Sequence, residues 1–336
     1  MIRKLFILVC GAVFAGQANA ACVVDTISAE GGSPPSTMTI SAFTITIDAD
    51  QPADSTKYIS DVNTATQGFL VSHDQCVTGN LYGKNVTAML GESLGNGLFA
   101  TNIDGIAIKP LWNNGGNPAY GTFNSSGEMT FSTPTGRWDY GENSYFRIEI
   151  YKIKDTLALT NPVGQQVLPG GTIAYNWVNS NSVVNYAQKL DISQINIIST
   201  PSCTFDGTKF VDFGLVTSGN LSNGIERDLN FDITCKTDYG QYSATAAITT
   251  QTPTADGNYI KVKDNEGQDD RMRIKISDST GRLLALDGSA NEQKINIASA
   301  TPAEFKWKAT LEPASVSAKP ANGKFSAAAE IILQIN

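Results

Sequence analysis

The residues able to perform catalysis are few, and none of them stands in a catalytic motif. The chain of 336 residues holds one histidine, His73, and no G-x-S-x-G sequence, so a serine or cysteine hydrolase would have a single imidazole as its base. We interpret His73 as a surface-loop residue. A glycoside hydrolase needs two carboxylates that face each other across a cleft, and no motif pairs the candidates Glu128, Asp139 and Glu142. We therefore expect a protein that is not an enzyme and that needs no cofactor.

Binding chemistry is better represented, in a region between Gly91 and Tyr145 that is rich in glycine, asparagine and aromatic residues. A sugar or peptide receptor requires a rigid aromatic platform and short polar side chains that pair with hydroxyl or amide groups. Two predicted surface loops meet this requirement: the first holds Trp112, Asn113, Asn114 and Tyr120, and the second begins at Trp138. The alternative is structural, because Asn-Gly runs often only make turns and a tryptophan can simply cover a core.

The charge balance excludes one class of partner. The chain carries 24 Lys and Arg against 32 Asp and Glu, a net charge of −8. Binding to nucleic acid depends on basic side chains that displace counterions from phosphates. We therefore expect no nucleic-acid partner. The 41% of apolar residues and the length of the chain are enough for about two domains, each with its own core.

The first 20 residues have the three parts of a secretory signal. Arg3 and Lys4 precede the apolar stretch from Leu5 to Phe14, and an A-x-A cleavage site ends at Ala20. The apolar stretch is shorter than the roughly 20 residues that span a bilayer, which disfavours a retained anchor. A lipoprotein attached through Cys22 is a weaker alternative. We expect residues 1–20 to be removed during export.

Four cysteines remain after that cleavage: Cys22, Cys76, Cys203 and Cys235. An even number of cysteines in an exported chain predicts two disulfides. The long cysteine-free stretch between the second and the third favours sequential pairing within two domains, although three connectivities are possible. No C-x-x-C cluster supports a metal site.

Two-residue alternation in short runs is the dominant pattern of the chain, and it predicts antiparallel strands with one buried face. The clearest runs are Phe43–Ile47, Phe146–Ile150, Met272–Ile276 and Phe305–Leu311. Met38 and Ile40 have the opposite parity from the first of these runs, so we expect a bulge near Ser41-Ala42. The fold class is therefore all-β, with two β-sandwiches.

We place the domain boundary near Ser193, which gives a first domain of residues 21–193 and a second of residues 194–336. The polar stretch from Asn179 to Ser182 precedes this point. Ile195-Asn196-Ile197 then begins a strand that we expect to lead into the second cysteine pair.

The end of the chain carries the motifs of a known family. From Gly323 onward one parity is apolar, which predicts a terminal strand: Phe325, Ala327, Ala329, Ile331, Leu333 and Ile335. Before it stand Pro201-Ser202-Cys203-Thr204, Val211-Asp212-Phe213-Gly214 and Phe231-Asp232-Ile233-Thr234-Cys235. In their order and spacing these pieces resemble the pilin domains of chaperone–usher fimbriae, with Ile335 where that family often has an aromatic residue.

The resemblance implies an incomplete Ig-like pilin domain, whose groove stays open until another chain supplies a strand. The apolar face of the terminal strand is the expected lining of this donor-strand groove. An unfilled groove exposes apolar surface and an unpaired edge, so the implied partners are a periplasmic chaperone, an outer-membrane usher and the next fimbrial subunit. The alternative is an ordinary strand in a complete sandwich.

We expect this subunit to end the fibre. The expected mature chain has no donor extension, since Ala21 stands directly before Cys22 and a further domain precedes Cys203. This layout resembles the tip adhesins of type 1 and type 3 fimbriae, through Leu98–Ile106 and Tyr145–Tyr151. It implies a protein exported through the periplasm to the fimbrial tip, with an N-terminal lectin-like domain that binds a receptor.

The same resemblance suggests where the receptor binds. In the mannose-binding relatives, polar pocket residues lie in the loop before the strand matched here by Phe146–Tyr151. Only Asp139 and Asn143 carry over, flanked by Trp138 and Tyr140. The relatives' N-terminal aromatic has no counterpart, because we expect the mature chain to start at Ala21. A mannoside, another glycan and a matrix protein such as collagen all remain open as receptors.

A non-adhesive tip adaptor or structural subunit is the main alternative, and an exported glycan-active enzyme is a weaker one. We expect an adaptor to carry a single pilin domain with a donor extension. The additional N-terminal domain therefore favours the adhesin.

Overall fold

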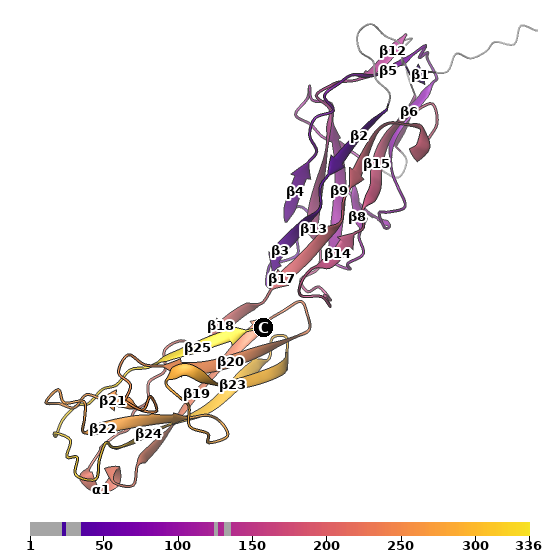
Figure 1. Cartoon of the computed structure of the whole chain (residues 1–336). Helices are drawn as coiled ribbons and strands as arrows, with labels where there is room; N and C mark the ends of the chain where they lie inside the picture. The colour runs from indigo at the N-terminus through magenta and orange to yellow at the C-terminus, as the bar shows by residue number, and fades with distance from the viewer. Residues whose placement is uncertain (1–21, 25–34, 124–126, 131–135) are drawn as a thin grey trace, which may run out of the picture.

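The chain forms two β-sandwiches placed end to end (Figure 1). The computed structural model describes residues 22–24, 35–123, 127–130 and 136–336, so the predicted signal lies outside the described residues. The predicted all-β class is confirmed: within the described residues the helical elements are α1 (Ser218–Leu221) and the 3-10 turn η1 (Val183–Asn185). Each sandwich holds one disulfide, Cys22–Cys76 and Cys203–Cys235, which confirms the sequential pairing.

Two large sheets face each other in the first sandwich. One has the order β11 (Gly127–Thr130), β6 (Leu81–Val86), β15 (Gly171–Val178), β16 (Tyr186–Ile192) and β2 (Ser36–Ile40). The other has the order β4 (Ser60–Asn63), β13 (Tyr145–Lys152), β9 (Ile106–Asn113), β8 (Leu98–Ala100) and β7 (Ser93–Gly95), with β10 (Gly121–Thr122) also paired to β9. The predicted alternation of β13 is confirmed, because Phe146, Ile148 and Ile150 are buried in the core between the sheets.

Two smaller sheets complete the first sandwich at its two ends. One has the order β14 (Gln165–Leu168), β17 (Ile195–Thr200) and β3 (Phe43–Asp48). The other has the order β1 (Val23–Val24), β5 (Val71–Asp74) and β12 (Arg137–Tyr140). The Cys22–Cys76 disulfide joins the residue before β1 to the segment that follows β5.

A change of sheet, rather than the expected bulge, explains the change of parity at Ser41-Ala42. β2 pairs in parallel with β16, whereas β3, two residues further on, pairs in parallel with β17 in another sheet. Because the chain passes from one sheet to the next, Met38 and Ile47 both reach the same core despite their opposite parity.

The predicted boundary between residues 193 and 194 falls directly before β17, which pairs with β14 and β3. Ile195 and Ile197 of β17 are buried in the core of the first sandwich. The strand that follows the predicted boundary therefore packs with the first sandwich. We infer that the passage between the domains follows Thr200, where β17 ends.

The second sandwich contains the remaining strands. One sheet has the order β18 (Ser202–Phe205), β19 (Ile225–Lys236), β24 (Pro302–Pro313), β22 (Met272–Ser277) and β21 (Ile260–Val262), and the other has β23 (Asp287–Ala298), β20 (Gln241–Thr249) and β25 (Glu330–Ile335). The predicted strands at Met272–Ile276 and Phe305–Leu311 are confirmed. Phe231 stacks on Phe305 at the centre of the core, with ring centroids 4.9 Å apart.

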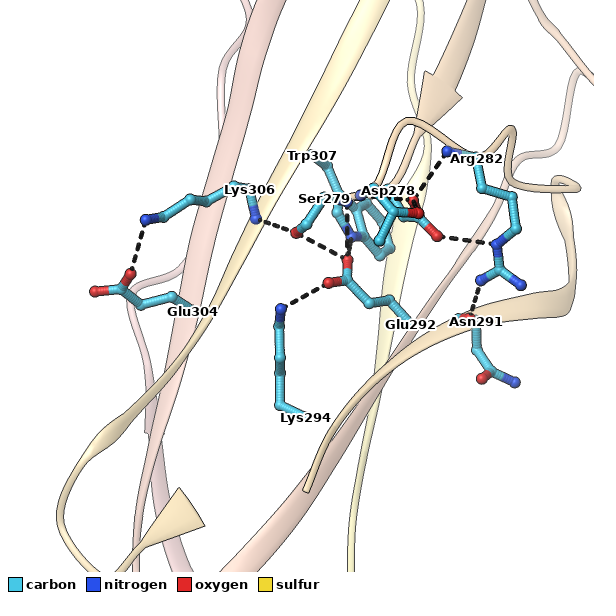
Figure 2. Close-up of polar contacts among 10 residues, drawn as sticks. Asp278, Ser279, Arg282, Asn291, Glu292, Lys294, Glu304, Lys306 and Trp307 are labelled. Atoms are coloured by element: carbon cyan, nitrogen blue, oxygen red, sulfur yellow. Dashed lines mark hydrogen bonds and ion pairs between the residues drawn. The ribbon is translucent and has the colours of Figure 1, made fainter. Parts of the chain in front are cut away.

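A buried carboxylate ties β23 to β24 and to the turn after β22 (Figure 2). Glu292 accepts hydrogen bonds from Trp307 Nε1 at 2.6 Å and from the hydroxyl of Ser279 at 3.1 Å, and it pairs with Lys294 Nζ at 2.7 Å. Burial alone would raise the pKa of Glu292, but these contacts outweigh burial and lower it. The carboxylate is therefore charged at neutral pH and holds the two sheets together.

A second buried carboxylate joins the two sandwiches. Asp238, which is 1% exposed, accepts hydrogen bonds from the backbone N–H of Leu157 at 2.7 Å and from the hydroxyl of Ser199 at 2.7 Å. The Tyr239 hydroxyl accepts from the backbone N–H of Ser199 at 3.0 Å, and Tyr239 packs against the first core. The junction is thus held by buried polar contacts.

Candidate binding pocket and strand groove

A pocket of about 280 Å³ lies in the first sandwich, where β6 and β15 approach β9 and β12. Its lining is Tyr82, Gly83, Lys84, Trp112, Asn114, Met129, Trp138, Asp139, Tyr140, Gly141 and Asn176. The two predicted sites meet here, because Trp112 lies near the end of β9 and Trp138 lies in β12. The pocket therefore combines residues from segments that are far apart in the sequence.

Four aromatic side chains form the walls of the pocket. The centroids of Tyr82 and Trp138 are 4.8 Å apart, and those of Trp112 and Tyr140 are 6.1 Å apart in an edge-to-face arrangement. Burial raises the pKa of Tyr140 well above its usual range, so its hydroxyl stays neutral at physiological pH. Such walls offer ring faces to an apolar surface of a ligand at little cost in side-chain entropy.

Two polar residues that the sequence did not suggest stand side by side in the pocket. Lys84 of β6 lies opposite Asn176 of β15 in the strand register, and Lys84 Nζ is 4.9 Å from the centroid of the Trp112 ring. Burial lowers the pKa of Lys84. A lysine on the same parity as Tyr82 and Val86 is the one sequence signal that could have indicated this position.

Asn176 ends a buried row of amides that crosses the sandwich. Its Nδ2 donates to Gln188 Oε1 at 2.7 Å, and Gln188 Nε2 donates to Gln67 Oε1 at 2.6 Å. Gln67 Nε2 in turn donates to the carbonyl of Tyr140 at 3.1 Å. The Oδ1 atom of Asn176 has no hydrogen-bond partner among the described residues.

The eight residues predicted to contact a receptor divide into two groups. Trp112, Asn114, Trp138, Asp139 and Tyr140 line the pocket, whereas Asn113, Tyr120 and Asn143 are not among the lining residues. Asn113 is buried and makes the turn that was the structural alternative, since its Nδ2 donates to the carbonyl of Asn117 and its Oδ1 accepts from the N–H of Gly115. Asn143 is exposed, and its side chain lies against Gly115.

Tyr120 belongs to a different surface. Its hydroxyl hydrogen-bonds to that of Tyr145 at 3.0 Å, and the guanidinium of Arg147 lies 5.4 Å from the centroid of its ring. The two tyrosines and the arginine lie on the face of the β13–β9 sheet opposite Phe146, which points into the core.

His73 is a correction to the sequence interpretation. It lies in β5 rather than in a surface loop, it is 4% exposed, and it stands opposite Trp138 in the strand register. Burial lowers its pKa to about 4, against a smaller opposing effect of Asp139. Asp139 itself pairs with Arg137 Nε at 2.9 Å, and β12, which carries both residues, also lines the pocket.

The second sandwich has a larger apolar groove of about 790 Å³. Its lining includes Phe325, Ala327, Ala329 and Ile331, four of the six predicted groove residues. Leu333 and Ile335, the other two, pack half-buried against the core of the same sandwich. The groove also contacts Phe210 and Val211 on its other side, and core residues such as Leu229, Ile248 and Ile274 form its base.

The groove follows a sheet edge that has no neighbouring strand. β25 pairs with β20 on one side and is the last strand of its sheet among the described residues. This strand is shorter than predicted, because it begins at Glu330 and the preceding segment makes only a single bridge, between Ser326 and Lys263. Phe210, on the opposite rim, is 91% exposed.

Two other kinds of feature are absent from the described residues. They contain no helix with the length and apolarity needed to cross a membrane. They also contain no group of three or more His, Cys, Asp or Glu side chains that could hold a metal ion.

Comparison with known proteins gives one family match, which includes the second sandwich. Residues 193–336 match the family described as Fimbrial protein. The match covers the segment whose motifs resemble the pilin domains of fimbriae. No curated protein matches the chain.

Several solved structures are similar to the chain at low identity. One is a chain of the CsuC-CsuE chaperone-tip adhesion subunit pre-assembly complex of Acinetobacter baumannii, with 10% identity, a TM-score of 0.42, and coverage of 90% of this chain and 99% of that chain. Another is CfaE, the adhesive subunit of CFA/I fimbria of enterotoxigenic Escherichia coli, with 11% identity, a TM-score of 0.36, and coverage of 90% and 93%. The receptor-binding domain of MrkD1P of Klebsiella pneumoniae has 16% identity, a TM-score of 0.37, and coverage of 52% and 96%.

Proposed function

We propose that this protein is a fimbrial adhesin whose first sandwich binds a receptor and whose second sandwich accepts a strand from the next subunit of the fibre. The observation that carries the proposal is the apolar groove beside the unpaired edge of β25, in the segment that matches the Fimbrial protein family. The aromatic pocket of the first sandwich supplies the receptor site.

Donor-strand complementation follows from the physics of this edge. The outer edge of β25 presents backbone groups that an added strand can pair, as in β-augmentation. Alternate side chains of that strand would enter the groove and cover residues such as Ile331 and Phe213. Before assembly a periplasmic chaperone would cover the same surface and deliver the subunit to an outer-membrane usher, because exposed edges promote aggregation.

The proposed place at the fibre tip has its own support. The segment directly before Cys203 is β17, which is hydrogen-bonded to β14 and β3 of the first sandwich. A segment that is built into a folded domain cannot extend into a neighbouring subunit. In this proposal the second sandwich accepts a strand from another subunit. The segment that precedes it cannot be donated in turn, because this segment is part of the first sandwich.

Receptor binding is tested on the full mature chain, complemented with a donor-strand peptide, against a glycan array and a panel of matrix proteins that includes collagen. We expect saturable binding that Trp112→Ala weakens at least tenfold and that Tyr58→Ala, an exposed aromatic residue outside the pocket lining, leaves unchanged. Absence of any saturable binding would overturn the adhesin and favour a non-adhesive adaptor. Turnover of a bound glycan would favour an enzyme.

A further inference from the structure

The charges of the pocket are not balanced. Lys84 and Asp139 are the charged residues of its lining in the described part of the chain. Asp139 is neutralised by Arg137, with 2.9 Å between carboxylate oxygen and guanidinium nitrogen. Lys84 makes no ion pair with any described carboxylate. The pocket therefore presents one uncompensated positive charge.

The position of Lys84 is unusual for a lysine. It lies between Tyr82 and Val86 on the inward parity of β6, where Val86 packs against the core. A Cβ atom on Gly121 would come within 2.2 Å of Lys84 Nζ, so this glycine leaves the space that the ammonium group occupies. Desolvation of a cation is unfavourable unless a partner of opposite charge compensates it.

The adjacent Asn176 supplies the second sign of a missing ligand. The side chain is 0% exposed, its amide nitrogen is held by Gln188, and its Oδ1 atom lacks a partner among the described residues. A buried acceptor without a hydrogen bond costs free energy, which a donor from a ligand would recover. Its cross-strand pairing with Lys84 puts a cation and a hydrogen-bond acceptor next to each other in the pocket.

On the basis of the proposed adhesive function, we propose that the pocket binds an acidic sugar residue of a glycan, with the sugar carboxylate at Lys84 Nζ and a sugar hydroxyl donating to Asn176 Oδ1. The aromatic walls made by Trp112 and Tyr82 would contact the C–H face of the ring. The volume of about 280 Å³ suits one sugar residue and favours it over a folded peptide segment.

The test compares matched ligands on the unaltered protein, so it does not depend on the folding of a variant. The full mature chain, complemented with a donor-strand peptide, is titrated with sialyl and uronic oligosaccharides and with the methyl esters of the same compounds. We expect the acids to bind and the esters to bind roughly 10- to 100-fold more weakly, because the ester removes a charge-assisted hydrogen bond. Equal affinity for acid and ester would overturn the inference.

Two variants then test whether Lys84 supplies the positive charge that binds the acid. Lys84→Met should reduce affinity for the acid by roughly 10- to 100-fold and abolish the difference between acid and ester. Lys189→Met is the matched control, since Lys189 also lies over an aromatic ring, that of Tyr186, but outside the pocket lining. Affinity of Lys84→Met equal to that of the unaltered protein, in a variant with an unchanged melting temperature, would overturn the inference.

The outcomes separate the inference from the function on which it rests. Tight binding of neutral glycans that is insensitive to Lys84→Met would overturn the acidic ligand while leaving the adhesin intact. Binding of acidic peptides in preference to acidic sugars would also overturn it. Binding of no glycan and no matrix protein would overturn the adhesin itself.

Discussion

The buried His73 makes the first sandwich sensitive to acid. Burial lowers the pKa of this imidazole from 6.5 to about 4, so the folded chain holds it neutral at pH 7. Between those two pH values the unfolded chain binds more protons than the folded chain, and acid therefore favours unfolding. The loss of stability begins as the pH falls through 6.5 and is complete below about 4.

The size of the effect follows from the two pKa values. At about 1.4 kcal/mol per pKa unit, the interval from 6.5 to about 4 corresponds to about 3 kcal/mol, of which about 2 kcal/mol is lost by pH 5. His73→Phe fills the same site with a ring that does not titrate. We expect the free energy of unfolding of the variant to fall about 2 kcal/mol less than that of the unaltered protein between pH 7 and pH 5.

Urea denaturation followed by tryptophan fluorescence measures this difference. Trp112, Trp138 and Trp177 lie in the first sandwich and Trp307 lies in the second, so the signal comes mostly from the domain that holds His73. Carboxylates with lowered pKa values, such as Glu292, also lose stability in acid, but they are present in both proteins and cancel in the comparison. Equal pH dependence of His73→Phe and the unaltered protein would refute the assignment.

Two further predictions concern the junction between the sandwiches and the packing of β6 at the pocket. Asp238→Ala leaves the Leu157 N–H and the Ser199 hydroxyl without their acceptor, at about 1–3 kcal/mol each, and should increase interdomain flexibility in small-angle X-ray scattering. Asp238→Asn keeps an acceptor and should change the profile less, while identical profiles for all three proteins would contradict the proposed role of the carboxylate. Gly83→Ala places a Cβ 2.4 Å from the Gly127 carbonyl oxygen and should destabilise the first sandwich by about 1–3 kcal/mol in urea. Gly136→Ala, where a Cβ meets nothing within 4 Å, is the control, and equal stability of the two variants would argue against this packing.

Strands with one buried face were predictable from the sequence. In Phe146–Ile150 and Phe305–Leu311 the alternation directly reports which side chains enter a core, because successive side chains of a strand point to opposite faces. The same property exposed the parity change after Ile40, but alternation alone does not say to which sheet a strand belongs. The parallel pairing of β3 with β17 is a long-range contact, and the pairing of β17 with the first domain was missed for that reason.

The aromatic residues of the pocket and the polar residues Asn114 and Asp139 were predictable, whereas Lys84 and Asn176 were not. Trp112 and Trp138 are conspicuous in a sequence, whereas Asn176 resembles an ordinary outward-facing residue of its strand. Its role depends on the register that sets it opposite Lys84 and on the amide of Gln188 that holds it. Tyr120 lies outside the pocket lining and contacts Tyr145 instead, and the sequence could not show this because packing decides which face of a sheet a side chain meets.

His73 shows that a short strand without alternation cannot be distinguished from a loop by its sequence. Val71, Ser72 and His73 are all buried, so β5 has no alternation to distinguish it from a loop. The strand is covered on both faces, and a run of this kind reveals its burial only in the folded chain.

The proposed open groove of the second sandwich is tested most directly by its response to an added strand. The full mature chain is heated with and without a peptide of alternating apolar residues, and with a control peptide in which the apolar positions are replaced by serine. At a peptide concentration 100 times its Kd, binding contributes about 2.7 kcal/mol, which should raise the melting temperature of this sandwich by roughly 10 °C. Hydrogen–deuterium exchange should then show new protection along β25, whose outer edge has no partner strand in the described chain. An unchanged melting temperature and unchanged exchange in β25 would contradict an open groove.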